Sequence, residues 1–197
     1  MKKFFCLLFT AQLCLAACAH ERELPVPDPG RIQRYTTDVK YQSDILGMQM
    51  KYSVLLPKDY MTDKTKRYPV VYMLHGYGDN NNSWNGNWLH ANSVIETLEA
   101  AGLPDMIYVF PEGFTSYYSN FYTGKFNYMD MFVEELVPLI DKTYRTIADR
   151  QHRSITGYSM GGFGAMVLPE KHPELFLCSA PLSMSFRTDK QYMTESQ

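Results

Sequence analysis

Short apolar runs alternate along this chain with segments of helical periodicity, and this alternation constrains the fold more than any other feature. The apolar runs predict strands over Pro69–Leu74, Met106–Phe110, Arg153–Thr156 and Leu175–Ala180. Helices are predicted between them, over Val94–Ala101, 127–140 and Met160–Lys171. Strands that alternate with helices form a parallel sheet covered on both faces. We therefore expect an α/β fold, a three-layer sandwich with a mostly parallel sheet.

An antiparallel hairpin is predicted ahead of the alternating region. Strand-like residues over Thr37–Tyr41 and Lys51–Leu56 flank a turn at Gly47. Farther along, Asn127 is placed to cap a helix that contains Pro138, and the missing proline N–H predicts a kink there. With 197 residues and no internal repeat, the chain fits one domain, over residues 35–197.

The first residues have the features of an export signal. Lys2 and Lys3 precede the apolar stretch Phe4–Ala17, which is too short to span a bilayer. It runs into Cys18 through Leu-Ala-Ala, which resembles the lipobox of bacterial lipoproteins, where the cysteine is acylated. We expect a signal peptide over 1–17 and a lipidated Cys18 that holds an exported protein on a membrane of the cell envelope, periplasmic or at the cell surface. The alternative is an ordinary secretory signal with an incidental Cys18.

Residues 18–34 are expected to form a tether, because prolines and charges dominate them. Cys6 and Cys14 leave with the signal, so Cys178 has no cysteine left for an internal disulfide. Its apolar surroundings predict a small buried core residue. The formal net charge is −2 and there is no long basic run, so nothing indicates a nucleic-acid partner.

The motif that carries chemistry is Gly157-Tyr158-Ser159-Met160-Gly161-Gly162. It lies where a predicted strand gives way to a predicted helix, the setting in which G-x-S-x-G marks a nucleophile. A serine on so sharp a turn needs neighbours without side chains, which Gly157 and Gly161 provide. The helix that starts at Met160 points its positive end at the turn, which favours a negatively charged oxygen there. Ser159 is the predicted nucleophile; the alternative is a glycine-rich turn whose serine caps a helix.

A second motif, His75-Gly76-Tyr77-Gly78, directly follows the strand Pro69–Leu74. In hydrolases of this architecture, a backbone N–H of that loop joins the N–H after the nucleophile to bind the oxyanion. The predicted donors are the backbone N–H groups of Tyr77 and Met160. His75 could serve as a base, but its position at the strand end favours a structural role in holding the loop.

Taken together, the stretch from Tyr52 to Pro181 resembles the putative esterase family of the α/β-hydrolase superfamily, which includes esterase D and the feruloyl and acetylxylan esterases. The pieces that carry the resemblance are Val54-Leu55-Leu56-Pro57, Tyr68–Gly76, Glu134-Glu135-Leu136-Val137-Pro138, Gly157–Ala165 and His172–Phe176. The resemblance implies an α/β-hydrolase fold and hydrolysis of short acyl or aryl esters, without a metal or organic cofactor. It also implies that the segment Glu112–Asn120 borders the substrate, with Tyr117 and Tyr118 as substrate-binding candidates; the alternative for these tyrosines is packing of a surface loop.

A serine nucleophile needs a histidine base and an orienting carboxylate, which in this family follow the serine. After Ser159 come His172, beyond the far end of its helix, and Asp189, in a polar tail. His90 and His152 are placed no better. We expect that the sheet's last strands, with the base and carboxylate, are missing from this chain, and that the chain alone has little activity; the alternative is a protein that has lost catalysis.

The predicted function is hydrolysis of a carboxylic ester through a serine acyl-enzyme. An acylated or feruloylated carbohydrate is the expected substrate, because an exported enzyme meets polymers outside the cell. An acyltransferase of the same fold, in which a sugar hydroxyl replaces water, is one alternative. A non-catalytic carbohydrate-binding lipoprotein is another.

Overall fold

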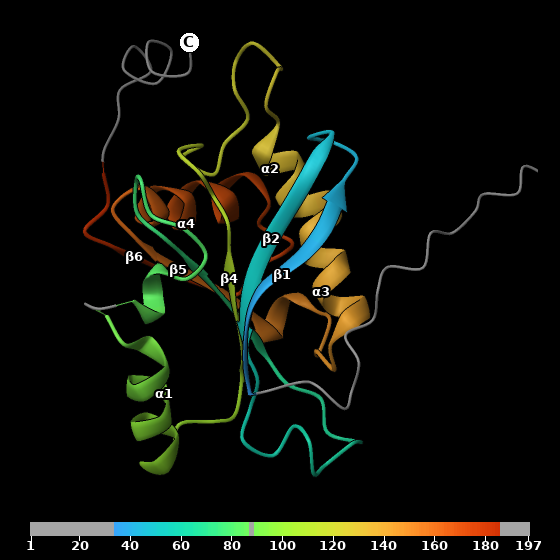
Figure 1. Ribbon diagram of the computed structural model, residues 1–197, viewed down its shortest axis with the longest axis vertical. Coiled ribbons are helices and arrows are strands. Elements are labelled where there is room, and N and C mark those ends of the chain that lie inside the picture. The colour runs from blue at the N-terminus through green and yellow to red at the C-terminus, as the bar shows by residue number, and fades with distance from the viewer. Residues whose placement is uncertain (1–33, 87–88, 186–197) are drawn as a thin grey trace, which may run out of the picture.

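The computed structural model describes residues 34–86 and 89–185 (Figure 1). The predicted signal peptide, Cys18 and Asp189 lie outside these residues. The described part contains a six-stranded sheet in the order β1-β2-β4-β3-β5-β6. Its strands are β1 (Tyr35–Ser43), β2 (Met48–Leu55), β3 (Val70–Leu74), β4 (Ile107–Pro111), β5 (Arg153–Tyr158) and β6 (Cys178–Leu182).

The predicted hairpin and the parallel sheet are both present. Strands β1 and β2 pair antiparallel, and β2 also pairs antiparallel with β4. The remaining neighbours, β4 with β3, β3 with β5 and β5 with β6, are parallel. Parallel strands end at the same edge of a sheet, and the β3–β5 register places Leu74 beside Gly157. The loops that follow β3 and β5 therefore start side by side, and both motifs singled out in the sequence lie in them.

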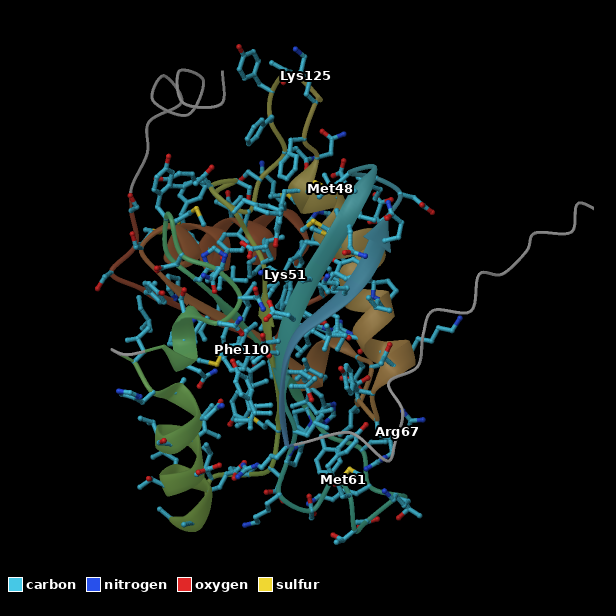
Figure 2. All side chains as sticks on the ribbon, in the orientation of Figure 1. Met48, Lys51, Met61, Arg67, Phe110 and Lys125 are labelled. Atoms are coloured by element: carbon cyan, nitrogen blue, oxygen red, sulfur yellow. The ribbon has the colours of Figure 1, made fainter. Side chains whose placement is uncertain are left out.

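Helices cover the two faces of the sheet. They are α1 (Ala91–Ala100), α2 (Tyr128–Met131), the π-helical turn η2 (Phe132–Leu136), α3 (Val137–Thr143), α4 (Met160–Lys171) and the short 3-10 turns η1 (Ser83–Asn85) and η3 (Arg150–His152). Helix α1 buries Ile95 against one face, where Phe110 of β4 also packs (Figures 1 and 2). Residues of η2, α3 and α4 pack with Tyr72 and Val109 on the other face. The three-layer prediction is confirmed.

Aromatic side chains fill much of the larger core layer. Tyr72 of β3 packs against Phe132 with ring centroids 5.3 Å apart and against Phe176 at 6.2 Å. All three are nearly or fully buried. Burying a side chain such as Phe132 contributes about 1.5–3 kcal/mol, and tilted or edge-on ring pairs add about 0.5–1.5 kcal/mol. This layer fixes α4 against β3 and β5, and thereby the place where α4 begins.

The predicted kink near Pro138 takes the form of a wider helical turn. Helix α2 continues through the π-helical turn η2 into α3, and Pro138 is the second residue of α3. Because proline has no N–H, the preceding turn loses an α-helical hydrogen bond, and a π turn is one way to accommodate that loss. Asn127 stands at the N-cap of α2 as predicted, but its side chain makes no capping hydrogen bond.

The last predicted strand is displaced toward the C-terminus. The prediction placed it over Leu175–Ala180, whereas β6 runs over Cys178–Leu182. Phe176 is buried in the core before the strand begins. The prediction that Cys178 is buried is wrong, because β6 is the last strand of the described sheet and its residues are exposed. Within residues 34–86 and 89–185, no helix has the length and apolarity needed to cross a bilayer.

Candidate active site

Ser159 lies on the sharp turn between β5 and α4. Strand β5 ends at Tyr158 and α4 begins at Met160, so the serine alone joins the two elements. Its backbone angles are φ 55° and ψ −116°. A non-glycine residue with positive φ is strained and persists only where the surrounding structure holds it. The structure thus places Ser159 in the geometry expected for a nucleophile elbow, defined here as Gly157–Gly161.

Two glycines make this turn possible. A Cβ atom on Gly157 would lie 2.3 Å from the carbonyl oxygen of Gly161, and one on Gly161 would lie 2.2 Å from that of Leu74. Both distances are far below van der Waals contact, and the atoms met are backbone atoms that cannot step aside. The sequence argument for these glycines therefore holds, with close backbone approach as the physical cause.

Backbone hydrogen bonds connect the elbow to the end of β6 and the residues that follow it. The Ser159 N–H donates to the Leu182 carbonyl at 3.0 Å, and the Ser185 N–H donates to the Ser159 carbonyl at 3.1 Å. Gly162 adds a third close approach, since a Cβ there would lie 2.7 Å from the Leu182 oxygen. The strained serine is thus held by the backbone on both of its sides.

The β3 loop, residues 75–79, lies beside the elbow. Tyr77 presents 59% of its surface to solvent, while His75 is 1% exposed. The Gly113 N–H donates to His75 Nε2 at 2.8 Å, so the proton resides on Nδ1, which donates to the Gly76 carbonyl at 2.8 Å. With both ring nitrogens bound to backbone groups, His75 joins the β3 loop to the start of the next loop. This arrangement favours the predicted structural role over that of a base.

The aromatic loop, residues 112–127, carries the predicted substrate-binding tyrosines. Tyr117 packs against Tyr77 and against Phe163 of α4, with ring centroids 5.9 Å apart in both cases. Tyr117 thus connects the aromatic loop to the exposed residue of the β3 loop. Both Tyr117 and Tyr118 have positive φ, 55° and 56°. The structure brings Tyr117 to the candidate site.

Tyr118 points the other way, into the core. It is fully buried, and its hydroxyl donates to the His75 carbonyl at 3.1 Å. Its ring fills the space beside Gly113 and Gly164, where a Cβ would approach it to 2.6 Å in each case. Burial raises the pKa of this hydroxyl well above its usual value, so it stays protonated and donates. In this conformation the Tyr118 side chain is not exposed to a ligand. It supports the β3 loop through its hydrogen bond to the His75 carbonyl.

Two residues at the site escaped the sequence analysis. Tyr158 donates a hydrogen bond from its hydroxyl to the Asp79 carboxylate at 2.7 Å. Burial and, after it, the bond to Asp79 raise the pKa of Tyr158. Tyr158 occupies the variable position of G-x-S-x-G, and the motif itself predicts no role for the side chain there. The tyrosine hydroxyl at that position was the available signal.

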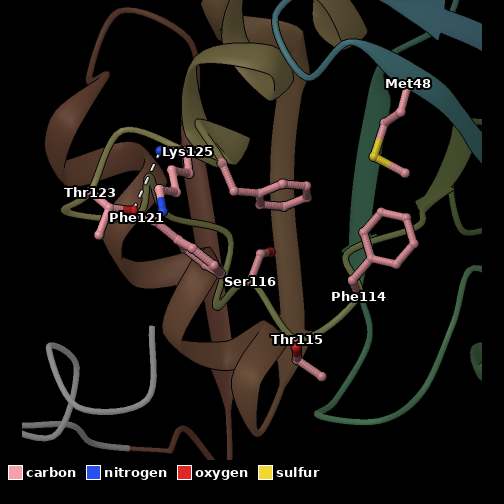
Figure 3. Close-up of a pocket in the computed structure, with 8 residues that line it drawn as sticks. Met48, Phe114, Thr115, Ser116, Phe121, Thr123 and Lys125 are labelled. Carbon is pink, nitrogen blue, oxygen red and sulfur yellow. Dashed lines mark hydrogen bonds between the residues drawn. The ribbon is translucent and has the colours of Figure 1, made fainter. Parts of the chain in front are cut away.

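A cavity of about 580 Å³ opens on the aromatic loop (Figure 3). Its walls are mainly apolar, and Lys125 is the one charged residue among them. The lining residues are Met48, Phe114, Thr115, Ser116, Phe121, Thr123, Lys125 and Phe126. None of them belongs to the elbow or the β3 loop, so the cavity is separate from the strained serine. It shares the aromatic loop with Tyr117, which does reach the β3 loop.

The histidines other than His75 in the described part lie at the ends of other elements and have other partners. His172 follows the last residue of α4, and its Nδ1 lies 3.3 Å from Glu174. His152 precedes β5 and lies 2.8 Å from Asp149. His90 precedes α1. In the described part of the chain, no group of three or more His, Cys, Asp or Glu side chains could hold a metal ion.

The comparison with known families decides where this chain belongs. The family described as “Putative esterase” matches residues 43–192, which include both motifs and the aromatic loop. The chain belongs to the putative esterase family. It is 33% identical over 154 residues to an endo-1,4-beta-xylanase/feruloyl esterase of Xylanibacter ruminicola, covering 75% of this chain and 20% of that protein. It is 32% identical over 136 residues to an esterase of Mycobacterium tuberculosis, covering 68% of this chain and 28% of that protein. This chain thus covers less than a third of the length of either relative.

Solved structures of esterases share the fold of this family member. A ferulic acid esterase superposes with a TM-score of 0.70 at 35% identity, covering 76% of this chain and 58% of that one. A CE1 ferulic acid esterase from Anaeromyces mucronatus superposes with a TM-score of 0.66 at 20% identity, covering 83% of this chain and 65% of that one. The predicted α/β-hydrolase fold is confirmed by these likenesses and by the mixed six-stranded sheet.

Proposed function

We propose that this member of the putative esterase family hydrolyses carboxylic esters through an acyl-enzyme on Ser159. The observation that carries the proposal is the backbone of Ser159, with φ 55° at the junction of β5 and α4. Such strain persists only where neighbouring structure maintains it, and it concentrates at functional sites. Gly157 and Gly161 allow the turn, and the backbone at Leu182 holds it.

In the proposed reaction, Ser159 Oγ attacks the ester carbonyl and the carbonyl oxygen becomes an oxyanion. The N–H groups of Met160, at the positive end of α4, and of Tyr77 would donate to that oxygen. Collapse of the tetrahedral intermediate expels the alcohol, and water then releases the acid from the serine. None of the described histidines is proposed as the base that takes the serine proton: His75 is bound at both nitrogens, and His172 and His152 lie at the ends of α4 and β5 that are remote from Ser159. We propose that the base and its carboxylate lie outside the described residues.

For the substrate, we propose an acylated or feruloylated carbohydrate. Two relatives support this class: one named endo-1,4-beta-xylanase/feruloyl esterase and a solved ferulic acid esterase. The cavity on the aromatic loop offers Phe114, Phe121 and Phe126 as ring surfaces for the apolar part of such an ester. Tyr117, packed on Tyr77, would mark the boundary between this cavity and the reacting carbonyl.

The test is to assay the full protein with p-nitrophenyl acetate and methyl ferulate, beside Ser159→Ala. Hydrolysis and labelling by a fluorophosphonate are expected for the wild type, and Ser159→Ala should abolish both. Ser93→Ala is the matched control, because Ser93 is an exposed serine of α1. A folded wild type that is neither active nor labelled would sink the esterase proposal. Acyl transfer to an added sugar that outruns hydrolysis would assign the acyltransferase alternative instead.

We also propose that Cys18 carries a lipid that anchors the exported protein in the bacterial cell envelope. The support is the sequence before it, a charged start followed by a short apolar stretch and Leu-Ala-Ala. Several acyl chains hold a protein firmly on a membrane, whereas one does so only weakly. Cys18→Ala should move the protein from the membrane to the soluble fraction, and Cys178→Ala should not. Unchanged partitioning of Cys18→Ala would remove the anchor.

A further inference from the structure

The two proposed oxyanion donors belong to separate loops, and the sheet does not hold them together. Tyr77 follows β3, and Met160 follows β5. The ladder between these strands ends at the pair Leu74 and Gly157, before either donor is reached. Backbone hydrogen bonds of the sheet therefore fix where the loops begin, but not the distance between the two N–H groups.

A side-chain hydrogen bond spans the two loops at the level of the donors. The Tyr158 hydroxyl donates to Asp79 Oδ2 at 2.7 Å. Tyr158 precedes Ser159 in the elbow, two residues from Met160, and Asp79 lies two residues from Tyr77. Asp79 is itself tied into the β3 loop, because its N–H donates to the Gly76 carbonyl at 3.2 Å. The bond therefore connects the turn that carries one donor to the turn that carries the other.

The Tyr158 ring is confined before its hydroxyl makes this bond. Trp84 packs on it in a T-shaped arrangement with ring centroids 5.0 Å apart. The β3 loop also approaches the ring, since a Cβ on Gly76 would lie 2.7 Å from Tyr158 Cε2, and a glycine is needed for the loop to lie this close. Because the ring has little room to move, a shift of Asp79 would have to break the bond rather than carry the ring along.

We propose that the Tyr158–Asp79 hydrogen bond is a positioning device that sets the separation of the Tyr77 and Met160 N–H groups. This inference rests on the proposed function, since it assigns a role within that reaction. The carboxylate acceptor makes the bond stronger than one between neutral groups. Oxyanion stabilisation depends on donors already held in place when the charge develops, so a loosened loop lowers the rate of the chemical step. Substrate binding in the ground state does not depend on that separation.

Tyr158→Phe tests the inference, because it removes the hydroxyl and keeps the ring against Trp84 and Gly76. For p-nitrophenyl acetate we expect kcat to fall about tenfold, less than the loss of a whole oxyanion donor, with KM within about twofold. The rate of fluorophosphonate labelling of Ser159 should fall by a similar factor. Asp79→Ala should match Tyr158→Phe, and the double variant should be no slower than either single one. Asp79→Asn keeps an acceptor oxygen and should recover part of the rate.

Tyr35→Phe is the matched control. Its hydroxyl donates to Asn82, farther along the same connection, at 3.4 Å, and does not reach the elbow. Its kcat should stay within about twofold of the wild type. If the wild type is active but both Tyr158→Phe and Asp79→Ala keep their kcat, or lose rate only through KM, the positioning role is overturned while the esterase proposal stands. A wild type that is inert and unlabelled overturns both proposals. Asp79 is exposed, so the Asp79 variants keep the test available if Tyr158→Phe does not fold.

Discussion

The elbow and the aromatic loop lie in the same part of the molecule but are held in different ways. In the elbow, backbone segments pack directly on one another, so that a Cβ on Gly157 or Gly161 would come within 2.3 Å of a carbonyl oxygen. In the aromatic loop, aromatic rings pack on one another: the ring centroid of Phe126 lies 6.1 Å from that of Phe114 and 5.4 Å from that of Phe121. Backbone contacts tolerate no side chain at those positions, whereas ring contacts tolerate other rings. Under the proposed function, the reaction takes place at the elbow and the aromatic loop selects the substrate.

The first prediction tests the backbone packing of the elbow. Gly161→Ala places a Cβ 2.2 Å from the Leu74 carbonyl oxygen, so the start of α4 must move away from β3. We expect kcat/KM for p-nitrophenyl acetate to fall about 10³-fold, as when an oxyanion donor is lost. Gly86→Ala is the control, since its Cβ would meet nothing closer than 3.4 Å. Near-normal activity of Gly161→Ala would show that the close approach is not needed.

The second prediction concerns Tyr118 of the aromatic loop, which packs beneath the β3 loop and beside Gly164 of α4. Tyr118→Ala empties a fully buried site beside Gly113 and Gly164 and should lower the free energy of unfolding by about 3–5 kcal/mol. Tyr118→Phe keeps the ring but leaves the His75 carbonyl without its donor, which should cost about 1–2 kcal/mol. Urea denaturation measures both. Equal free energies of unfolding for the two variants would show that burial of the Tyr118 ring does not contribute to stability.

The third prediction tests the aromatic loop alone and has the smallest expected effect. Phe121→Ala removes a wall of the cavity and should raise KM for methyl ferulate about fivefold, or about 1 kcal/mol, with kcat unchanged. The small p-nitrophenyl acetate should be less affected. Met61→Ala is the control, because Met61 is exposed at the end of the molecule opposite Lys125 (Figure 2). A fall in kcat with unchanged KM would contradict the division between the two regions.

Patterns of apolarity and glycine made most of the fold predictable. The hairpin, the parallel strands and the helix Met160–Lys171 follow from periodicity and turn residues. The elbow is predictable because its glycines stand where a side chain would collide with the backbone. The position of β6 did not follow, because an apolar run reports average burial and not which residues face the core. Phe176 takes the core position, and Cys178 is left exposed on the last strand of the described sheet.

The side-chain contacts of the site were beyond the sequence for a related reason. Tyr117 and Tyr118 are identical neighbours, yet one packs on Tyr77 and the other is buried beside His75. Both residues have a positive φ angle, which the local sequence does not predict, and the partners that each ring finds come from distant parts of the chain. The bond between Tyr158 and Asp79 likewise joins residues far apart in the sequence.

The hydrogen bonds between Ser159 and the segment after β6 bear on the order in which the chain acquires its shape. The strained serine is held by Leu182 and Ser185, both of which come later in the chain. During synthesis, the turn can therefore reach its final geometry only after those residues have left the ribosome and β6 has paired with β5. Until then the turn at Ser159, with φ 55°, has only local support, from the neighbouring glycines and from the Phe163 N–H, which donates to the Ser159 carbonyl at 3.1 Å. We expect Ser159, the proposed nucleophile, to be among the last parts of this domain to become ordered, although its motif is the easiest to recognise.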